Sequence, residues 1–226
     1  GGLGRLQQGE RAPGVADDVG VGRVLHRPDR LEHLGVGVEA LQLGGDGVGS
    51  GVAGGHVGRE RFRGHIGHER FLGGQRLTRD LVRQVNATST GQNPMAAVLS
   101  CIDSRTPAEL VFDLGIGDIF SIRIAGNIIN NDILGSMEYS CEIAGSKIIT
   151  VLGHTKCGAI ISACNQINRG HLTGLMEKIR PAIELEVETS GMRNGENLSF
   201  VANVSRLNVV NMLHQIREQS SILATL

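Results

Sequence analysis

Two short motifs in this sequence combine residue types that bind soft metal ions. The first is CIDSR at residues 101–105, and the second is HTKC at residues 154–157. Two thiolates and one imidazole form a ligand set that Zn2+ accepts in tetrahedral geometry. Three protein ligands leave the fourth position for water or a substrate, which makes such a site catalytic rather than structural. We therefore predict a zinc site formed by Cys101, His154 and Cys157.

The elements around the motifs explain how these ligands can converge. Residues 96–101 (AAVLSC) and 147–152 (KIITVL) are short apolar runs, which predict strands buried on both faces. In the HxxC motif the first ligand ends a strand and the second begins a helix, so both can face one ion. Cys101 must then come from a neighbouring parallel strand, because ligands gather at the carboxyl ends of such strands. A helix that begins near Cys157 favours a thiolate there.

Each motif alone is a weak indication of a metal site, and other readings of the cysteines stay open. A single cysteine at a strand end is commonly a small core residue. The four cysteines could also form disulfides, but an intracellular chain of this length more often uses thiols for metal binding or catalysis. Cys141 and Cys164 lie on predicted helices without ligand spacing, and we expect them to be buried apolar residues.

The sequence after residue 70 alternates predicted helices and strands. A further strand is predicted at 119–124, and helices are predicted at 76–88, 106–113, 132–144, 157–167, 172–188 and 198–218. Strands that alternate with helices indicate an α/β fold, with a mostly parallel β-sheet flanked by helices.

Residues 1–68 differ in composition from the rest, which divides the chain into two regions. They are crowded with Gly, Val, Arg and His, and they show no sustained helical or strand period. Their many glycines raise the entropic cost of ordering the backbone. We predict a leader at 1–68 without an assigned function, and a domain at 69–226. The leader is expected to be disordered or the product of a wrong reading frame, and a glycine-rich β element is the third alternative.

Charge and composition exclude several classes of partner. The net charge is -1 and the pI is near 6.8, so no basic surface indicates nucleic acid or a membrane. Trp is absent and there is one Tyr, so aromatic stacking platforms for single strands are missing. No apolar run is long enough for a membrane span, and no signal or transit peptide is recognisable. The default expectation is a cytoplasmic protein with a small neutral or metal-bound partner.

From about residue 71 onward the sequence resembles the β-class carbonic anhydrases. The resemblance rests on CIDSR followed by GHTKCG, and on GQNP, GDIFSIRIAGN, MEYS and LNVVNML. It implies a β-carbonic anhydrase-like fold and a zinc-dependent lyase, carbonate dehydratase, that reversibly hydrates CO2 to bicarbonate through a zinc-bound hydroxide. It also implies a homodimer or higher oligomer when complete, with active sites at the subunit interface.

The resemblance further implies roles for residues near the metal. Asp103 and Arg105 match a pair in which the arginine holds the carboxylate off the metal, so that it accepts a hydrogen bond from the bound water. The alternative is an exposed ion pair of little energetic value. Gln92 matches a glutamine that donates to a bicarbonate oxygen, with a solvent-facing turn residue as the alternative. Arg123 and Asn127 are expected to support the site. The residues that match an apolar substrate pocket are Phe120, Ala125 and Tyr139, and core packing also explains Phe120 and Tyr139.

The sequence departs from the family at both ends, and two other functions stay open. The family's carboxyl-terminal strand is expected to be missing, and only the helix near 77–85 remains of the helices that clasp a partner subunit. The same fold and site could hydrolyse CS2 or COS. Part of the sequence also resembles anhydrases fused or linked to sulfate-permease-like transporters, where the domain could be a non-catalytic, zinc-stabilised regulatory module of an anion transporter. Intact Asp103, Arg105 and Gln92 argue against that module, since a structural zinc site needs none of them.

Overall fold

A computed structural model describes the backbone of residues 36–42 and residues 64–226 of this protein. Its strands are β1 (Val36–Gln42), β2 (Ala96–Ser100), β3 (Ile119–Arg123) and β4 (Ile148–His154). Its helices are α1 (Gly64–Leu72), α2 (Leu81–Ala87), α3 (Ala108–Val111), α4 (Asn131–Glu138), α5 (Gly158–Cys164), α6 (Leu172–Leu185), α7 (Leu198–Gln219) and α8 (Ser221–Thr225). A 3-10 turn, η1 (Ala125–Asn127), follows β3, and a π-helical turn, η2 (Tyr139–Ile143), follows α4.

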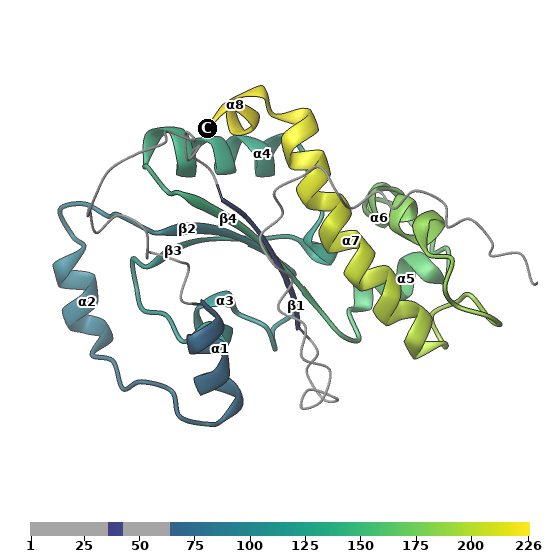
Figure 1. Cartoon of the computed structure of the whole chain (residues 1–226), viewed down its shortest axis with the longest axis horizontal. Helices are drawn as coiled ribbons and strands as arrows, with labels where there is room; N and C mark the ends of the chain where they lie inside the picture. The colour runs from purple at the N-terminus through teal and green to yellow at the C-terminus, as the bar shows by residue number, and fades with distance from the viewer. Residues whose placement is uncertain (1–35, 43–63) are drawn as a thin grey trace, which may run out of the picture.

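The strands form one sheet in the order β1-β4-β2-β3 (Figure 1). β2 pairs in parallel with both β3 and β4, whereas β1 pairs antiparallel with the outer edge of β4. The predicted α/β fold with a mostly parallel sheet is therefore confirmed. Ser100 pairs with Leu152, so the chain leaves β2 and β4 at the same edge of the sheet. This register brings the two predicted motifs together.

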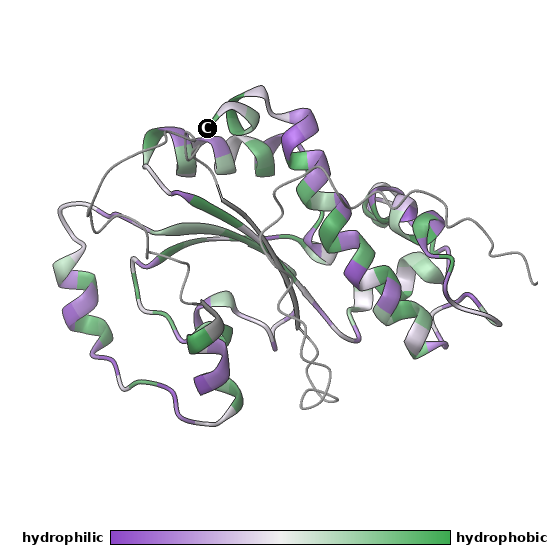
Figure 2. Cartoon of the chain, in the orientation of Figure 1, coloured by the Kyte–Doolittle hydropathy of each residue, from purple (hydrophilic) through white to green (hydrophobic). Residues whose placement is uncertain are grey.

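Successive residues of the central strands pack into two cores on opposite faces of the sheet. Every residue of β2 is buried, as expected for a strand covered on both sides. The larger core lies under α5, α6 and α7, and its strand residues are Ala97, Leu99, Ile149 and Val151. The smaller core lies under α3, and its strand residues are Ala96, Val98, Ile119, Ile148 and Leu152. The hydrophobic strands between these layers stand out in Figure 2.

Helix α7 is the long helix of the larger core, and it runs beside α5 and α6 (Figure 1). The Asn197 side chain caps it by accepting hydrogen bonds from the backbone of Ser199 and Phe200. One face is buried and the opposite face is polar, which is the pattern of a helix that lies on a core. Across residues 64–226, no helix combines the length and the hydropathy that crossing a membrane requires.

The helix predicted at 76–88 is shorter than expected, and its apolar face is exposed. It begins at Leu81 because the Asp80 side chain accepts a hydrogen bond from the backbone N–H of Arg83 at 2.9 Å and caps the helix there. No residue of α2 is buried, and the helix lies on the outer side of the molecule (Figure 1). The exposed apolar residues of the helix are Leu81, Val82 and Val85.

Three other predicted helices end or begin differently. The helix predicted at 106–113 is the single turn α3, because Asp113 has a φ of 48° and cannot continue a right-handed helix. The helix predicted at 132–144 changes from α to π geometry at Tyr139. The helix predicted at 157–167 is α5, which begins after Cys157 and is followed by Gln166 with a φ of 55°.

Most of the predicted leader lies outside the described residues. Within residues 1–68, Val36–Gln42 forms the edge strand β1. Helix α1 begins at Gly64 and therefore crosses the expected boundary between residues 68 and 69. His68 on this helix contacts the Val111 carbonyl oxygen at 3.2 Å, which joins α1 to α3.

Candidate metal centre

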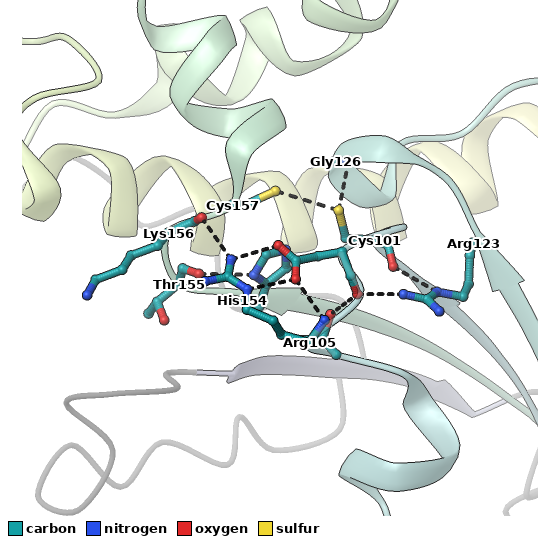
Figure 3. A network of polar contacts seen from close by, with 10 residues as sticks. Cys101, Arg105, Arg123, Gly126, His154, Thr155, Lys156 and Cys157 are labelled. Atoms are coloured by element: carbon teal, nitrogen blue, oxygen red, sulfur yellow. Dashed lines mark hydrogen bonds and ion pairs between the residues drawn. The ribbon is translucent and has the colours of Figure 1, made fainter.

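Cys101, His154 and Cys157 converge at the carboxyl-terminal edge of the parallel strands (Figure 3). Cys101 directly follows β2, His154 is the last residue of β4, and Cys157 caps the start of α5. All three residues are buried, and their ligand atoms lie within 4.8 Å of one another. The geometry therefore unites the two motifs into one cluster of two sulfurs and one imidazole.

The spacing of these donors fits a tetrahedral zinc ion. With zinc–sulfur bonds of about 2.3 Å, two thiolates on a tetrahedron are about 3.8 Å apart. The sulfurs of Cys101 and Cys157 are 3.8 Å apart. The Nδ1 atom of His154 lies 3.0 Å from the Thr155 carbonyl oxygen, to which it can donate, so Nε2 is left with the lone pair. This buried Nε2 atom has no hydrogen-bond partner among the residues that the structure describes, and a metal ion would satisfy it.

Charge in the cluster is concentrated on one sulfur. The hydrogen bond from Cys157 lowers the pKa of Cys101 to about 4, against the opposing effect of burial. The pKa of Cys157 is raised, because its thiol donates to Cys101 and is buried. Burial lowers the pKa of His154, but its interactions with Cys101 and Asp103 outweigh this and raise it overall. A bound divalent cation favours deprotonation of all three ligands, so metal binding would release protons.

Asp103 lies beside the cluster and is held by Arg105. The Nε and Nη2 atoms of Arg105 donate to the two carboxylate oxygens at 2.9 and 2.7 Å. Arg105 Nη2 also reaches the Lys156 carbonyl oxygen at 3.5 Å, which links the two motifs. Asp103 Oδ2 is 3.9 Å from His154 Nε2, so the carboxylate is next to a ligand atom. The hydrogen bonds from Arg105 hold the pKa of Asp103 well below its usual range.

Arg123 at the end of β3 and Gly126 in the η1 turn fix the backbone and the sulfur of the first motif. Arg123 donates through Nε to the Cys101 carbonyl oxygen at 3.0 Å and through Nη2 to the Asp103 carbonyl oxygen at 2.6 Å. The backbone N–H of Gly126 donates to the Cys101 sulfur at 3.4 Å. No role was predicted for Gly126, whose signals in the sequence are its place in the GDIFSIRIAGN motif and the AGN turn that follows the strand. The site thus includes a backbone donor that side-chain chemistry cannot reveal.

The three predicted pocket residues fall into two groups. The rings of Phe120 and Tyr139 meet edge to face, with 6.4 Å between their centroids. Tyr139 is 54% exposed, so core packing does not account for it. Ala125 directly precedes Gly126, whose N–H contacts the Cys101 sulfur.

Gln92 does not join the cluster within one chain. It lies in the turn before β2, whereas Cys101 follows that strand, which is about 13 Å long at 3.3 Å per residue. The Gln92 side chain is exposed. It lines a polar hollow together with Thr88, Ser89, Thr90, Gly91, Ile116 and Gly117.

The remaining cysteines are not part of the cluster. Cys141 and Cys164 are buried and free, as predicted, and both contribute to the larger core. Burial raises the pKa of each thiol to about 11, which makes both poor metal ligands.

Comparison with known proteins decides the family. The family model described as "Carbonic anhydrase" matches residues 96–226. This chain belongs to the carbonic anhydrase family. The match begins at the first residue of β2 and includes all three candidate ligands and the Asp103–Arg105 pair.

Two curated carbonic anhydrases show the extent of the likeness. "Carbonic anhydrase 2" of Mycobacterium tuberculosis is 40% identical over 112 residues, which cover 47% of this chain and 52% of that protein. "Carbonic anhydrase" of Mycolicibacterium smegmatis is 35% identical over 138 residues, which cover 59% of this chain and 64% of that protein. The match therefore spans between half and two thirds of these carbonic anhydrases.

The fold is that of the β-carbonic anhydrases. The crystal structure of the β-carbonic anhydrase CafA of Aspergillus fumigatus superposes with a TM-score of 0.52 at 23% identity. The superposition covers 62% of this chain and 68% of CafA.

Proposed function

We propose that this protein is a zinc-dependent carbonic anhydrase, which converts CO2 and water into bicarbonate and a proton. The observation that carries the proposal is the tetrahedral spacing of Cys101, His154 and Cys157 beside the Asp103–Arg105 pair. Membership of the carbonic anhydrase family supports it independently.

The reaction needs an activated water and a group that orients it. Cys101, His154 and Cys157 would hold the zinc ion, which would supply a Lewis acid able to lower the pKa of water from about 15.7 towards about 7. Asp103 accepts a hydrogen bond from the attacking water, so that an oxygen lone pair points at the carbon of CO2. Because Arg105 keeps the pKa of Asp103 low, the carboxylate stays ionised and orients the water without retaining its proton. The water oxygen forms the new C–O bond, and the proton leaves to buffer.

Arg105 has a second role, which is to keep the site open. Asp103 Oδ2 lies 3.9 Å from the ligand atom of His154 and is restrained by two hydrogen bonds from Arg105. Without them the carboxylate is free to turn onto the metal and to take the position that water needs.

We propose that Phe120, Ala125 and Tyr139 form the wall that receives CO2. The edge-to-face contact of Phe120 with Tyr139 supports this, as does the position of Ala125 next to Gly126. An apolar wall suits an uncharged substrate, and it strengthens the field of the metal by excluding water.

We also propose that the protein acts as a homodimer, in which Gln92 of one copy serves the metal site of the other. Two observations support this proposal. Gln92 and Cys101 flank opposite ends of β2, and helix α2 leaves the apolar side chains of Leu81 and Val82 exposed. In this arrangement the Gln92 amide donates to an oxygen of bicarbonate.

The decisive experiment is stopped-flow CO2 hydration by the purified protein, with its zinc content measured in parallel. We expect activity and stoichiometric zinc in the wild type, loss of both in Cys101→Ser, and zinc without activity in Asp103→Ala. A zinc-loaded wild type that hydrates no CO2 would contradict the proposal. Hydrolysis of CS2 or COS by that protein would then identify it as a hydrolase, and inactivity toward all three would favour the regulatory module.

Mixing two inactive variants tests the shared site. The Gln92→Ala chain keeps its zinc ligands, and the Cys101→Ser chain keeps Gln92. If Gln92 acts across the dimer, mixed dimers contain one intact site and regain activity. No recovery in dimers shown to be mixed would mean that Gln92 acts within its own chain or not at all.

A further inference from the structure

A buried asparagine on α7 contacts the backbone beside the metal ligands. Asn208 is 0% exposed, and its Nδ2 atom donates to the Gly126 carbonyl oxygen at 2.9 Å. Its Oδ1 atom is also buried but has no hydrogen-bond partner among the described residues. A half-satisfied amide costs stability in a core where an apolar side chain would pack without penalty. Core packing alone therefore does not explain an asparagine at this position.

Gly126, to which Asn208 donates, lies at a position that only glycine fits well. Gly126 has a φ of 70°, a backbone conformation that favours glycine. A Cβ atom here would lie 2.8 Å from Ile179 Cδ1 of α6 and 3.3 Å from the Ala159 Cβ of α5. Helices α5 and α6 thus leave no room for a side chain at Gly126, and Asn208 of α7 holds its carbonyl group.

The other peptide group of Gly126 faces the metal site. Its N–H donates to the Cys101 sulfur at 3.4 Å (Figure 3). The two peptide groups of Gly126 share its Cα and are linked through its φ and ψ torsions, so anchoring the carbonyl restricts the conformations that the η1 turn can adopt. The hydrogen bond of Asn208 therefore helps to keep the Gly126 N–H directed at the sulfur.

We propose that Asn208 is a positioning residue for the metal ligand Cys101. It acts through Gly126, whose N–H it aims at the sulfur, and it has no contact with the substrate. The inference rests on the zinc site of the proposed function and extends that site to the core of α7. Residues that orient metal ligands in this way typically change metal affinity about 10–100-fold when they are replaced.

A matched pair of variants on the same helix tests this role. Asn208→Leu removes the hydrogen bond to Gly126. Asn211→Leu also removes an amide whose Nδ2 is buried, but this nitrogen has no hydrogen-bond partner in the described part of the chain. Zinc affinity is measured by competition with a chromophoric chelator, and the sulfur-to-metal charge-transfer band is recorded after cobalt substitution. We expect about 10–100-fold weaker zinc binding and a changed band for Asn208→Leu alone.

Each outcome decides the question. Wild-type affinity and an unchanged cobalt band in folded Asn208→Leu overturn the proposal, and so does an equal loss of affinity in both variants. If the Asn208→Leu variant does not fold, Asn208→Ser serves instead, because the serine hydroxyl is too short to reach Gly126.

Amide exchange in cadmium-loaded wild type is a second measurement. Slow solvent exchange of the Gly126 amide supports its hydrogen bond to Cys101, and fast exchange contradicts it. A wild type that binds no zinc removes the proposed function and this inference together, whatever the variants do.

Discussion

The Arg105 guanidinium bonds both oxygens of the Asp103 carboxylate, through Nε at 2.9 Å and Nη2 at 2.7 Å. This two-point contact fixes the plane of the carboxylate as well as its position. The backbone N–H of Arg105 adds a third bond, to Oδ1 at 3.0 Å. A lysine cannot reproduce this arrangement, because its ammonium group is a single point of charge.

Replacement of Arg105 is therefore expected to reduce hydration even when the charge is kept. We predict a fall in kcat/KM of about 100-fold or more for Arg105→Ala, and a substantial fall for Arg105→Lys, since Asp103 loses its orientation in both. Zinc content should not fall. Arg180→Ala is the control, because Arg180 pairs with Glu177 on the surface at 3.7 Å, and it should behave as wild type. Full activity of Arg105→Lys would show that charge alone suffices.

Zinc is expected to stabilise the fold, because its ligands connect the ends of β2 and β4 with the start of α5. At a free zinc concentration of about 100 times Kd, binding should add about 2.7 kcal/mol to the free energy of unfolding. Thermal unfolding with added zinc and with a chelator measures this effect. Cys157→Ser should lose the response to zinc, whereas Cys164→Ser, a buried thiol outside the cluster, should keep it. If Cys157→Ser is still stabilised by zinc to the same extent as the wild type, Cys157 is not a zinc ligand.

The central strands and the ligand cluster could be predicted from the sequence because their signals are local. A continuous apolar run such as 96–100 predicts a strand that is buried on both faces. Because parallel strands end at the same edge of a sheet, the residues that follow them lie close together. The HTKC spacing needs only the change from strand to helix at residues 154–158. No information on distant contacts was required.

Contacts that depend on distant packing were not predictable in the same way. The periodicity of 76–88 indicated an apolar helix face, but it could not show that this face of α2 stays exposed among the described residues. Gln92 is close to Cys101 in sequence, yet a buried strand separates them in space. Asn208 lies in the LNVVNML motif, but the motif could not show what this side chain contacts, because its partner Gly126 is 82 residues away in the chain.

Acid is expected to weaken the fold through Asp113. Its carboxylate is buried and accepts hydrogen bonds from Arg70 and Arg79, each at 2.5 Å, while Arg76 lies 4.0 Å away. Burial raises the pKa of Asp113, but the two hydrogen-bonded arginines outweigh it and lower the pKa to about 2. Since the folded pKa is below the unfolded value of about 3.9, the stabilisation is complete above that value and is lost as the pH falls towards 2.

Urea unfolding at a series of pH values checks this prediction. The difference in unfolding free energy between wild type and Asp113→Asn should be constant near neutral pH and should shrink from about pH 4 downward. Glu177→Gln removes an exposed carboxylate and should differ little from wild type at any pH. A difference for Asp113→Asn that does not change with pH would mean that ionisation of this carboxylate contributes nothing to stability.

Two glycine-to-alanine changes should shift stability in opposite directions. Gly126→Ala introduces a side chain at a φ of 70° and within 2.8 Å of Ile179 Cδ1, so we expect a loss of about 1–3 kcal/mol. Gly174 is an exposed glycine of α6 where a Cβ atom would meet no described atom within 4 Å, and alanine there should add about 0.5–1 kcal/mol. Chemical unfolding of both variants measures the changes. Equal stability of Gly126→Ala and wild type would require the η1 turn to shift, which would also move the N–H that donates to Cys101.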